Sequence, residues 1–135
     1  MADQRYVSFI EALIQQTKGK KLNWRYLDRE ETLCEEMGWV KTTSLFAPIS
    51  GVKSAPTHNF DTENSFYVNV SGTYVVLYVW NNQPARLYVI PSTFKKVATL
   101  TPEEYGEHIT RLLNLVQSLF PSAEAFIDTF LARKT

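Results

Sequence analysis

The sequence predicts an α+β fold, with an antiparallel sheet of about four to five strands packed on an N-terminal helix and two C-terminal helices. Three observations lead to this class. An apolar stripe with helical spacing opens the chain, short strand-like segments fill its middle, and two further helical stripes close it. Helical and strand segments that are separated along the chain are typical of α+β proteins and not of parallel α/β sheets. Because the 135 residues contain no repeat or linker, we expect a single domain over residues 1–135.

The N-terminal region predicts a helix followed by a strand. With Asp3 as N-cap and Gly19 as stop signal, the helix is expected over residues 4–17. Its apolar stripe consists of Tyr6, Phe9, Ile10, Leu13 and Ile14. Residues 21–27 then alternate with period two, which predicts a half-buried strand that turns Leu22, Trp24 and Tyr26 inward.

A short acidic helix and a second strand follow. Asp28 and Glu31 form a capping-box pattern, so we expect Asp28 to cap a helix that ends at Gly38. The β-branched residues within 39–46 favour a strand. Residues 48–62 are rich in proline and small polar side chains, which predicts a long loop.

The middle of the chain predicts three antiparallel strands. A Ser71-Gly72 turn separates strands over residues 66–70 and 73–80. The expected pairs across this turn are Val70 with Thr73, Val68 with Val75, and Phe66 with Leu77. A third strand, residues 86–90, places Leu87 and Val89 on the same face only if the second loop has an odd length, for example with Val79 opposite Leu87. We therefore expect an odd loop.

Two helices are expected to close the fold. Thr101 as N-cap, Pro102 at the first helical position and Glu104 at the third form the strongest helix start in the chain. The buried stripe of this helix comprises Tyr105, Ile109, Leu112, Leu113, Val116 and Phe120. Pro121 and Ser122 begin the last helix, whose apolar residues are Phe126, Ile127, Phe130 and Leu131.

Charge and hydropathy exclude several function classes. The 14 basic side chains are balanced by 14 acidic ones, so the basic surplus of a nucleic-acid or anionic-membrane binder is missing, and we expect neither partner. The longest apolar run, residues 74–80, is far too short to span a bilayer. Cys34 is the only cysteine and cannot form an internal disulfide. These features predict a cytoplasmic protein.

A catalytic role has one weak candidate pair. Glu104 and His108 are four residues apart on one helix face, where they could act as acid and base in a small hydrolase, with His58 as a further candidate from the long loop. A pair of this spacing is also common as a solvated helix pair. No nucleophile accompanies them, because the glutamates around Cys34 disfavour its thiolate. We therefore expect a non-enzyme, without catalytic residues, metal or cofactor.

The central strands offer a candidate binding face. If their aliphatic side chains face the helices, the opposite face carries aromatic residues and one arginine, namely Tyr67, Tyr74, Tyr78, Trp80, Arg86 and Tyr88. Tyrosine, tryptophan and arginine are enriched at binding hot spots. The alternative is that residues 39–62 or a helix cover this face as a second core layer.

The function hypothesis follows from this aromatic face. We expect a small non-catalytic interaction protein that forms a homodimer or binds another protein through it. The second hypothesis is a small-molecule pocket lined by Tyr78, Trp80 and Tyr88. The hydrolase that uses Glu104 and His108 is the third.

Overall fold

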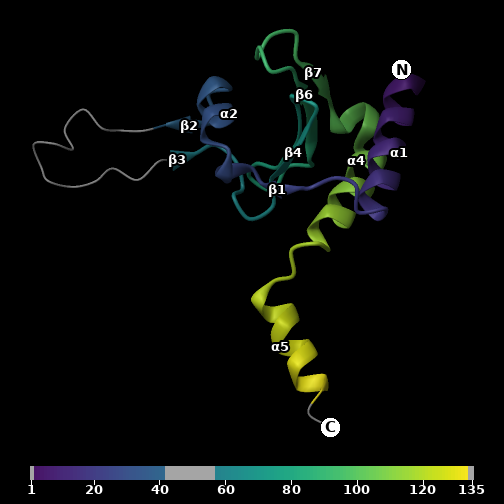
Figure 1. Cartoon of the computed structure of the whole chain (residues 1–135), viewed down its shortest axis with the longest axis vertical. Coiled ribbons are helices and arrows are strands. Elements are labelled where there is room, and N and C mark those ends of the chain that lie inside the picture. Colours follow the sequence, from purple (N-terminus) through teal and green to yellow (C-terminus); the bar gives the residue numbers. More distant parts are fainter. Residues whose placement is uncertain (1, 42–56, 134–135) are drawn as a thin grey trace, which may run out of the picture.

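The computed structural model describes residues 2–41 and 57–133 and has the predicted α+β class. Figure 1 shows a sheet between a pair of helices on one side and a smaller layer on the other, with the last helix projecting from this body. The elements are α1 (Gln4–Lys18), β1 (Arg25–Tyr26), the 3-10 helix η1 (Leu27–Arg29), α2 (Glu31–Glu36), β2 (Val40–Lys41), β3 (Thr57–His58), β4 (Phe66–Val70), β5 (Thr73–Tyr78), β6 (Arg86–Ile90), β7 (Ala98–Leu100), α4 (Pro102–Gln117) and α5 (Ala123–Ala132).

The main sheet has the order β1-β4-β5-β6-β7, with every neighbouring pair antiparallel. The predicted pairing of β4 with β5 is confirmed: Val70 faces Thr73, Val68 faces Val75, and Phe66 faces Leu77. The odd loop between β5 and β6 is also confirmed, because pairing of Tyr78 with Arg86 leaves residues 79–85 between them. Leu87 pairs with Leu77 instead of Val79, because the loop is longer than expected. The loop length is still odd, so Leu87 remains on the expected face of the sheet.

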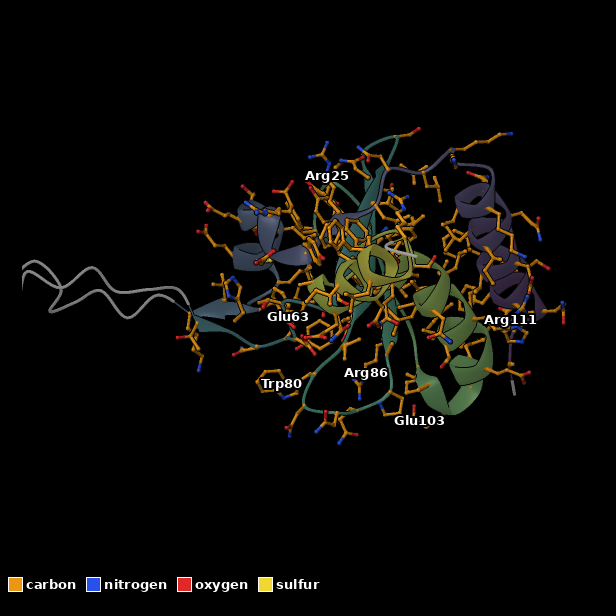
Figure 2. All side chains as sticks on the ribbon, turned by 90° about the horizontal axis from the view of Figure 1, so that it is seen from below. Arg25, Glu63, Trp80, Arg86, Glu103 and Arg111 are labelled. Carbon is orange, nitrogen blue, oxygen red and sulfur yellow. The ribbon has the colours of Figure 1, made fainter. Side chains whose placement is uncertain are left out.

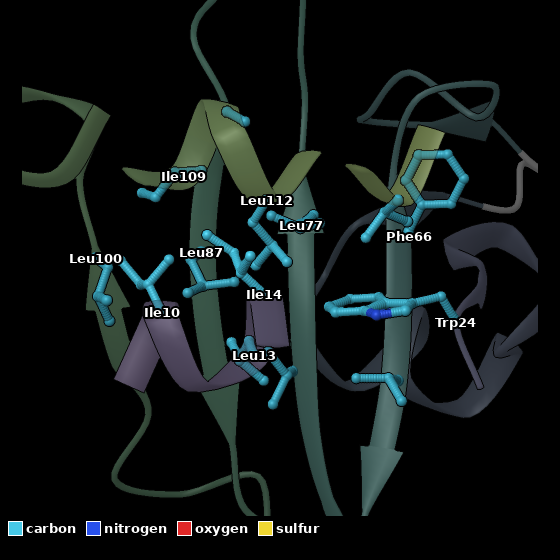
Figure 3. Close-up of a cluster of buried hydrophobic side chains, with 14 of the residues drawn as sticks. Ile10, Leu13, Ile14, Trp24, Phe66, Leu77, Leu87, Leu100, Ile109 and Leu112 are labelled. Atoms are coloured by element: carbon cyan, nitrogen blue, oxygen red, sulfur yellow. The ribbon is translucent and has the colours of Figure 1, made fainter. Parts of the chain in front are cut away.

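The main core lies between this sheet and the parallel helices α1 and α4. Figure 3 shows side chains of α1 and α4 against those of the strands, and none of the labelled residues is more than 5% exposed. The labelled residues are Ile10, Leu13, Ile14, Trp24, Phe66, Leu77, Leu87, Leu100, Ile109 and Leu112. The apolar stripes that the sequence assigned to the first helix and to the helix after Thr101 thus form one buried layer.

A second core lies on the opposite side of the sheet. It joins Val76 and Ile90, whose side chains point away from α1 and α4, to residues of η1, α2 and the adjoining chain. The covering residues are Leu27, Leu33, Cys34, Trp39 and Phe60, all buried. The sheet therefore has apolar side chains packed on both faces.

Two local predictions in the N-terminal part of the chain are wrong in detail. The strand predicted over residues 21–27 is paired only at Arg25 and Tyr26, because the Trp24 indole donates to Thr17 and stays against α1. Asp28 lies inside η1 and does not cap α2, whose N-cap is Glu30 without a side-chain bond.

The predicted long loop is also interrupted. Its residues 57–58 form β3, which pairs with β2 and so places His58 in a strand opposite Val40. The remainder of the predicted strand 39–46 beyond Lys41, and loop residues 48–56, lie outside the described residues. Strand β7 was not predicted, since three residues are too few to show an alternating pattern.

Helix α5 forms where it was expected but packs differently. Phe120 still belongs to the body, with its ring 4.8 Å from that of Tyr26 and 5.1 Å from that of Phe66. Pro121 follows, and the Ser122 side chain accepts a bond from the Ala125 amide and caps the new helix. No residue of α5 is buried.

Candidate functional site

The tyrosines of the predicted aromatic face are half-buried. Burial raises the pKa of Tyr67, Tyr74 and Tyr78 above the ordinary value for tyrosine. Tyr74 stacks on Phe94 with ring centroids 6.1 Å apart. These side chains therefore pack, partly buried, against the second core.

Trp39 is the main cover of this face. Its ring centroid lies 5.1 Å from that of Tyr78 and 5.3 Å from that of Tyr88. The Tyr78 hydroxyl donates to the carbonyl oxygen of Asn59 and so fixes the chain that follows β3. Most of the aromatic face is thus covered by a second layer that includes Trp39, as in the alternative in which residues 39–62 or a helix cover it.

One corner of the aromatic face stays open. Trp80 is 47% exposed and Arg86 is also exposed, at the end of the sheet where β5 and β6 are joined. Figure 2 shows both side chains at the lower edge of the body, with Trp80 pointing outward. Asn81 and Asn82 in this loop have positive φ values of 50° and 59°, which asparagine tolerates better than most residues.

The candidate catalytic pair is not brought together. Tyr105 has non-helical angles of φ −127° and ψ 15°, and this kink separates Glu104 from the helix that carries His108. His108 Nδ1 instead lies 3.4 Å from Glu11 Oε1 of α1. Arg111 donates to the same carboxylate and is the main cause of its lowered pKa. The group links α1 to α4 at the surface.

Cys34 has the environment of an unreactive thiol. It is buried and its Sγ donates to the Leu27 carbonyl oxygen over 3.4 Å. Burial, aided by carboxylates that include Asp28 and Glu30, raises the pKa of the Cys34 thiol to about 12. Among the described residues, no group of three histidine, cysteine or acidic side chains is placed to hold a metal ion.

Among the described residues, most of the exposed large apolar side chains lie on α5. Its four large apolar residues are Phe126, Ile127, Phe130 and Leu131, with exposed fractions of 67%, 47%, 55% and 57%. Of the other large apolar residues in the described chain, only Val70, Trp80 and Leu119 are exposed to a similar degree. The sequence correctly placed these residues on one helix, but their spacing alone could not show that the body leaves them uncovered.

A hollow of about 840 Å³ adjoins the start of α5. Phe66 and Phe120 form an apolar wall, Asn64 and Gln117 lie at its polar side, and Ala123 borders it from α5. The Gln117 amide donates to Asn64 Oδ1 over 3.0 Å, so this side of the hollow is fixed by a bond between α4 and the turn before β4. The apolar face of α5 and a hollow with one apolar wall and one polar side thus lie next to one another.

No family model, curated protein or solved structure matches the chain. No helix in residues 2–41 and 57–133 has the length and apolar character that crossing a membrane requires.

Proposed function

We propose that this chain is a small non-catalytic interaction protein and that the apolar face of α5 makes its principal contact with a protein partner. The observation that carries the proposal is the exposure of Phe126, Ile127, Phe130 and Leu131 on one helix with no buried residue. In α1 and α4 the equivalent apolar stripes are buried against the sheet.

The size of the surface supports a binding role. An aromatic side chain carries about 150–250 Å², so exposed fractions of 67% and 55% leave roughly 80–170 Å² each of Phe126 and Phe130 in water. With Ile127 and Leu131, the stripe reaches roughly 300 Å² or more, the size of the largest apolar patch on a typical monomer. Apolar patches of this size are often functional.

The length of α5 supports the same conclusion. The helix has 10 residues, and isolated helices shorter than about 12–15 residues are marginal in water. The Ser122 cap contributes to its stability, but most helical stability in proteins comes from packing of an apolar face. A partner on this face would supply that packing.

The charges on α5 favour a protein over a membrane surface. Interfacial membrane helices are generally rich in lysine and arginine on their polar face. The described polar positions of α5 carry Glu124 and Asp128, and the only described basic residue is Arg133 at the C-cap. This pattern would repel anionic lipid along most of the helix.

The open corner of the aromatic face is a second candidate contact. Trp80 and Arg86 are exposed and belong to the residue types enriched at hot spots. Binding through the rest of the predicted face, including Tyr67 and Tyr74, has less support because a second layer covers it. A small-molecule site at Tyr78 and Tyr88 has less support for the same reason, since Trp39 occupies that space.

Photo-crosslinking in the native cells tests the proposal. Benzoylphenylalanine at position 126 should yield covalent adducts heavier than the monomer, whereas the same probe at the exposed α1 residue Gln15 should yield few. Adducts that are absent at position 126, or equally abundant at position 15, would contradict a contact through α5.

A further inference from the structure

We infer that the partner of α5 is a second copy of this chain, whose α5 packs antiparallel to the first about a two-fold axis. This inference rests on the proposed function and names the partner for the same apolar face. Two-fold dimers use the same patch on both chains, so the patch must be complementary to itself. The pattern, charges and surroundings of α5 meet this condition.

The apolar pattern of α5 reads almost the same in both directions. Phe126 and Phe130 are four residues apart, as are Ile127 and Leu131, so they form two adjacent rows on one helix face. An antiparallel pair centred between Asp128 and Thr129 sets Phe126 at the level of Leu131 of the second copy, and Ile127 at the level of its Phe130. Each large apolar side chain then faces another one.

The charges favour the antiparallel direction. The acidic residues Glu124 and Asp128 lie in the first six residues of α5, and the basic Arg133 follows its last turn. Antiparallel pairing brings the acidic half of each helix near the basic end of the other, and it also opposes the two helix dipoles. Parallel pairing would place like charges at the same level.

The hollow beside α5 extends the proposed interface. In the antiparallel pair, the last turn of one α5 lies beside the first turn of the other, where Ala123 borders the hollow. Leu131 of the second copy would therefore approach the apolar wall formed by Phe66 and Phe120. Glu63, at the rim of the same hollow, adds a carboxylate on the side that the basic end of the second copy approaches.

The proposed interface reaches the area of a stable dimer only if the α5 stripes and the surface around the hollow are both buried. Two facing stripes remove roughly 600 Å² of apolar surface from water, about half of the 1,200 Å² at which stable specific interfaces begin. Contacts with the hollow and with exposed Leu119 before α5 are needed for the remainder. We therefore expect a dimer that dissociates on dilution.

The mass of the purified full chain in solution tests the inference. Light scattering across a concentration series should show a monomer–dimer equilibrium. Phe130→Asp should weaken association by at least about 100-fold, because each dimer loses two buried phenylalanines worth about tenfold or more apiece. Thr129→Asp adds the same charge one residue away, outside the apolar rows, and should have a much smaller effect. A wild-type monomer throughout, or equal effects of the two substitutions, would overturn the inference.

The direction of pairing needs a second readout. Benzoylphenylalanine at position 126, in a mixture of isotopically labelled and unlabelled copies, should form intermolecular adducts near Leu131. Adducts near residue 126 of the other copy would overturn the antiparallel arrangement.

The two proposals can fail separately. A monomeric purified chain whose position 126 crosslinks to a different protein in cells would refute the second copy and leave the proposed function standing. Absence of adducts from α5, or binding of the monomer to phosphatidylglycerol vesicles through α5, would refute both.

Discussion

The helices of the body and α5 carry similar apolar side chains, but these side chains are buried in the body and exposed on α5. In the body, the helices α1 and α4 bury their apolar stripes on one face of the sheet, and the layer around Trp39 covers the other face. In α5, Phe126 and Phe130 stack on one another with centroids 6.0 Å apart but remain largely in water. Helical spacing of apolar residues thus predicts an apolar face, but it does not show whether the described chain itself covers that face.

The largest expected effect sharpens the comparison within the body. Trp39→Ala should lower the free energy of unfolding by about 3–5 kcal/mol, because it removes a buried ring from above Tyr78 and Tyr88. Urea denaturation measures this loss. Trp80→Ala, at the 47% exposed corner, is the control and should cost about 1 kcal/mol or less. Equal losses would mean that the second layer is not a true core.

A matched pair of leucines compares the body with α5 directly. Leu112→Ala should lower the free energy of unfolding by about 2–5 kcal/mol, because Leu112 has 0% exposure in the main core. Leu131→Ala, at 57% exposure, should change it by no more than about 0.5 kcal/mol at concentrations where the chain is monomeric. Chemical denaturation of both variants at low concentration makes the measurement. A large loss from Leu131→Ala in the monomer would show that α5 packs on its own body.

A buried hydrogen bond in the body gives a smaller effect. The Trp24 indole nitrogen donates to Thr17 Oγ1 over 2.9 Å, and Thr17 is 3% exposed. Thr17→Val should cost about 1–3 kcal/mol in unfolding free energy, because the indole N–H loses its acceptor. Thr17→Ser keeps the hydroxyl and should recover much of the difference in thermal denaturation. If serine and valine cost the same, the bond contributes little.

The smallest expected effect concerns the reactivity of Cys34, which is buried in the second core. Because its pKa is raised from 9.0 to about 12, the thiolate fraction near pH 8 is about a thousandfold lower than in the unfolded chain. Reaction with Ellman's reagent should therefore be slow until the protein is unfolded by urea. The raised pKa also links the free energy of unfolding to pH, because the folded chain keeps the Cys34 thiol protonated. The stability that depends on the protonated thiol is complete below pH 9 and is lost as the pH rises toward 12. Rapid labelling of the folded chain would indicate that the layer opens readily.

The sequence predicts the features that depend on neighbouring residues. The turn at Gly72, with φ of 89°, fixes the register of β4 and β5, and parity then places Leu87 on the same face as Leu77. Such features follow from alternation and turn chemistry, which are local. The same reasoning identified the aromatic face, with the two interpretations that it binds a partner or is covered as a second core layer.

The features that depend on distant contacts could not be predicted in this way. Trp39 covers Tyr78 and Tyr88, which are some forty residues away or more, and no spacing rule connects them. Likewise, His108 meets Glu11 and not Glu104, because the helix kinks at Tyr105 and α1 packs alongside it. Helix α5 shows the same limit, since its apolar spacing does not reveal that the body leaves it uncovered.

Hydrogen exchange of the α5 amides at increasing protein concentration tests the central claim most directly. A helix stabilised by a second copy should exchange rapidly in dilute solution and become protected as concentration rises, while the amides of β5 in the body remain protected throughout. Protection of α5 that is absent at every concentration, or complete even in the monomer, would contradict the account.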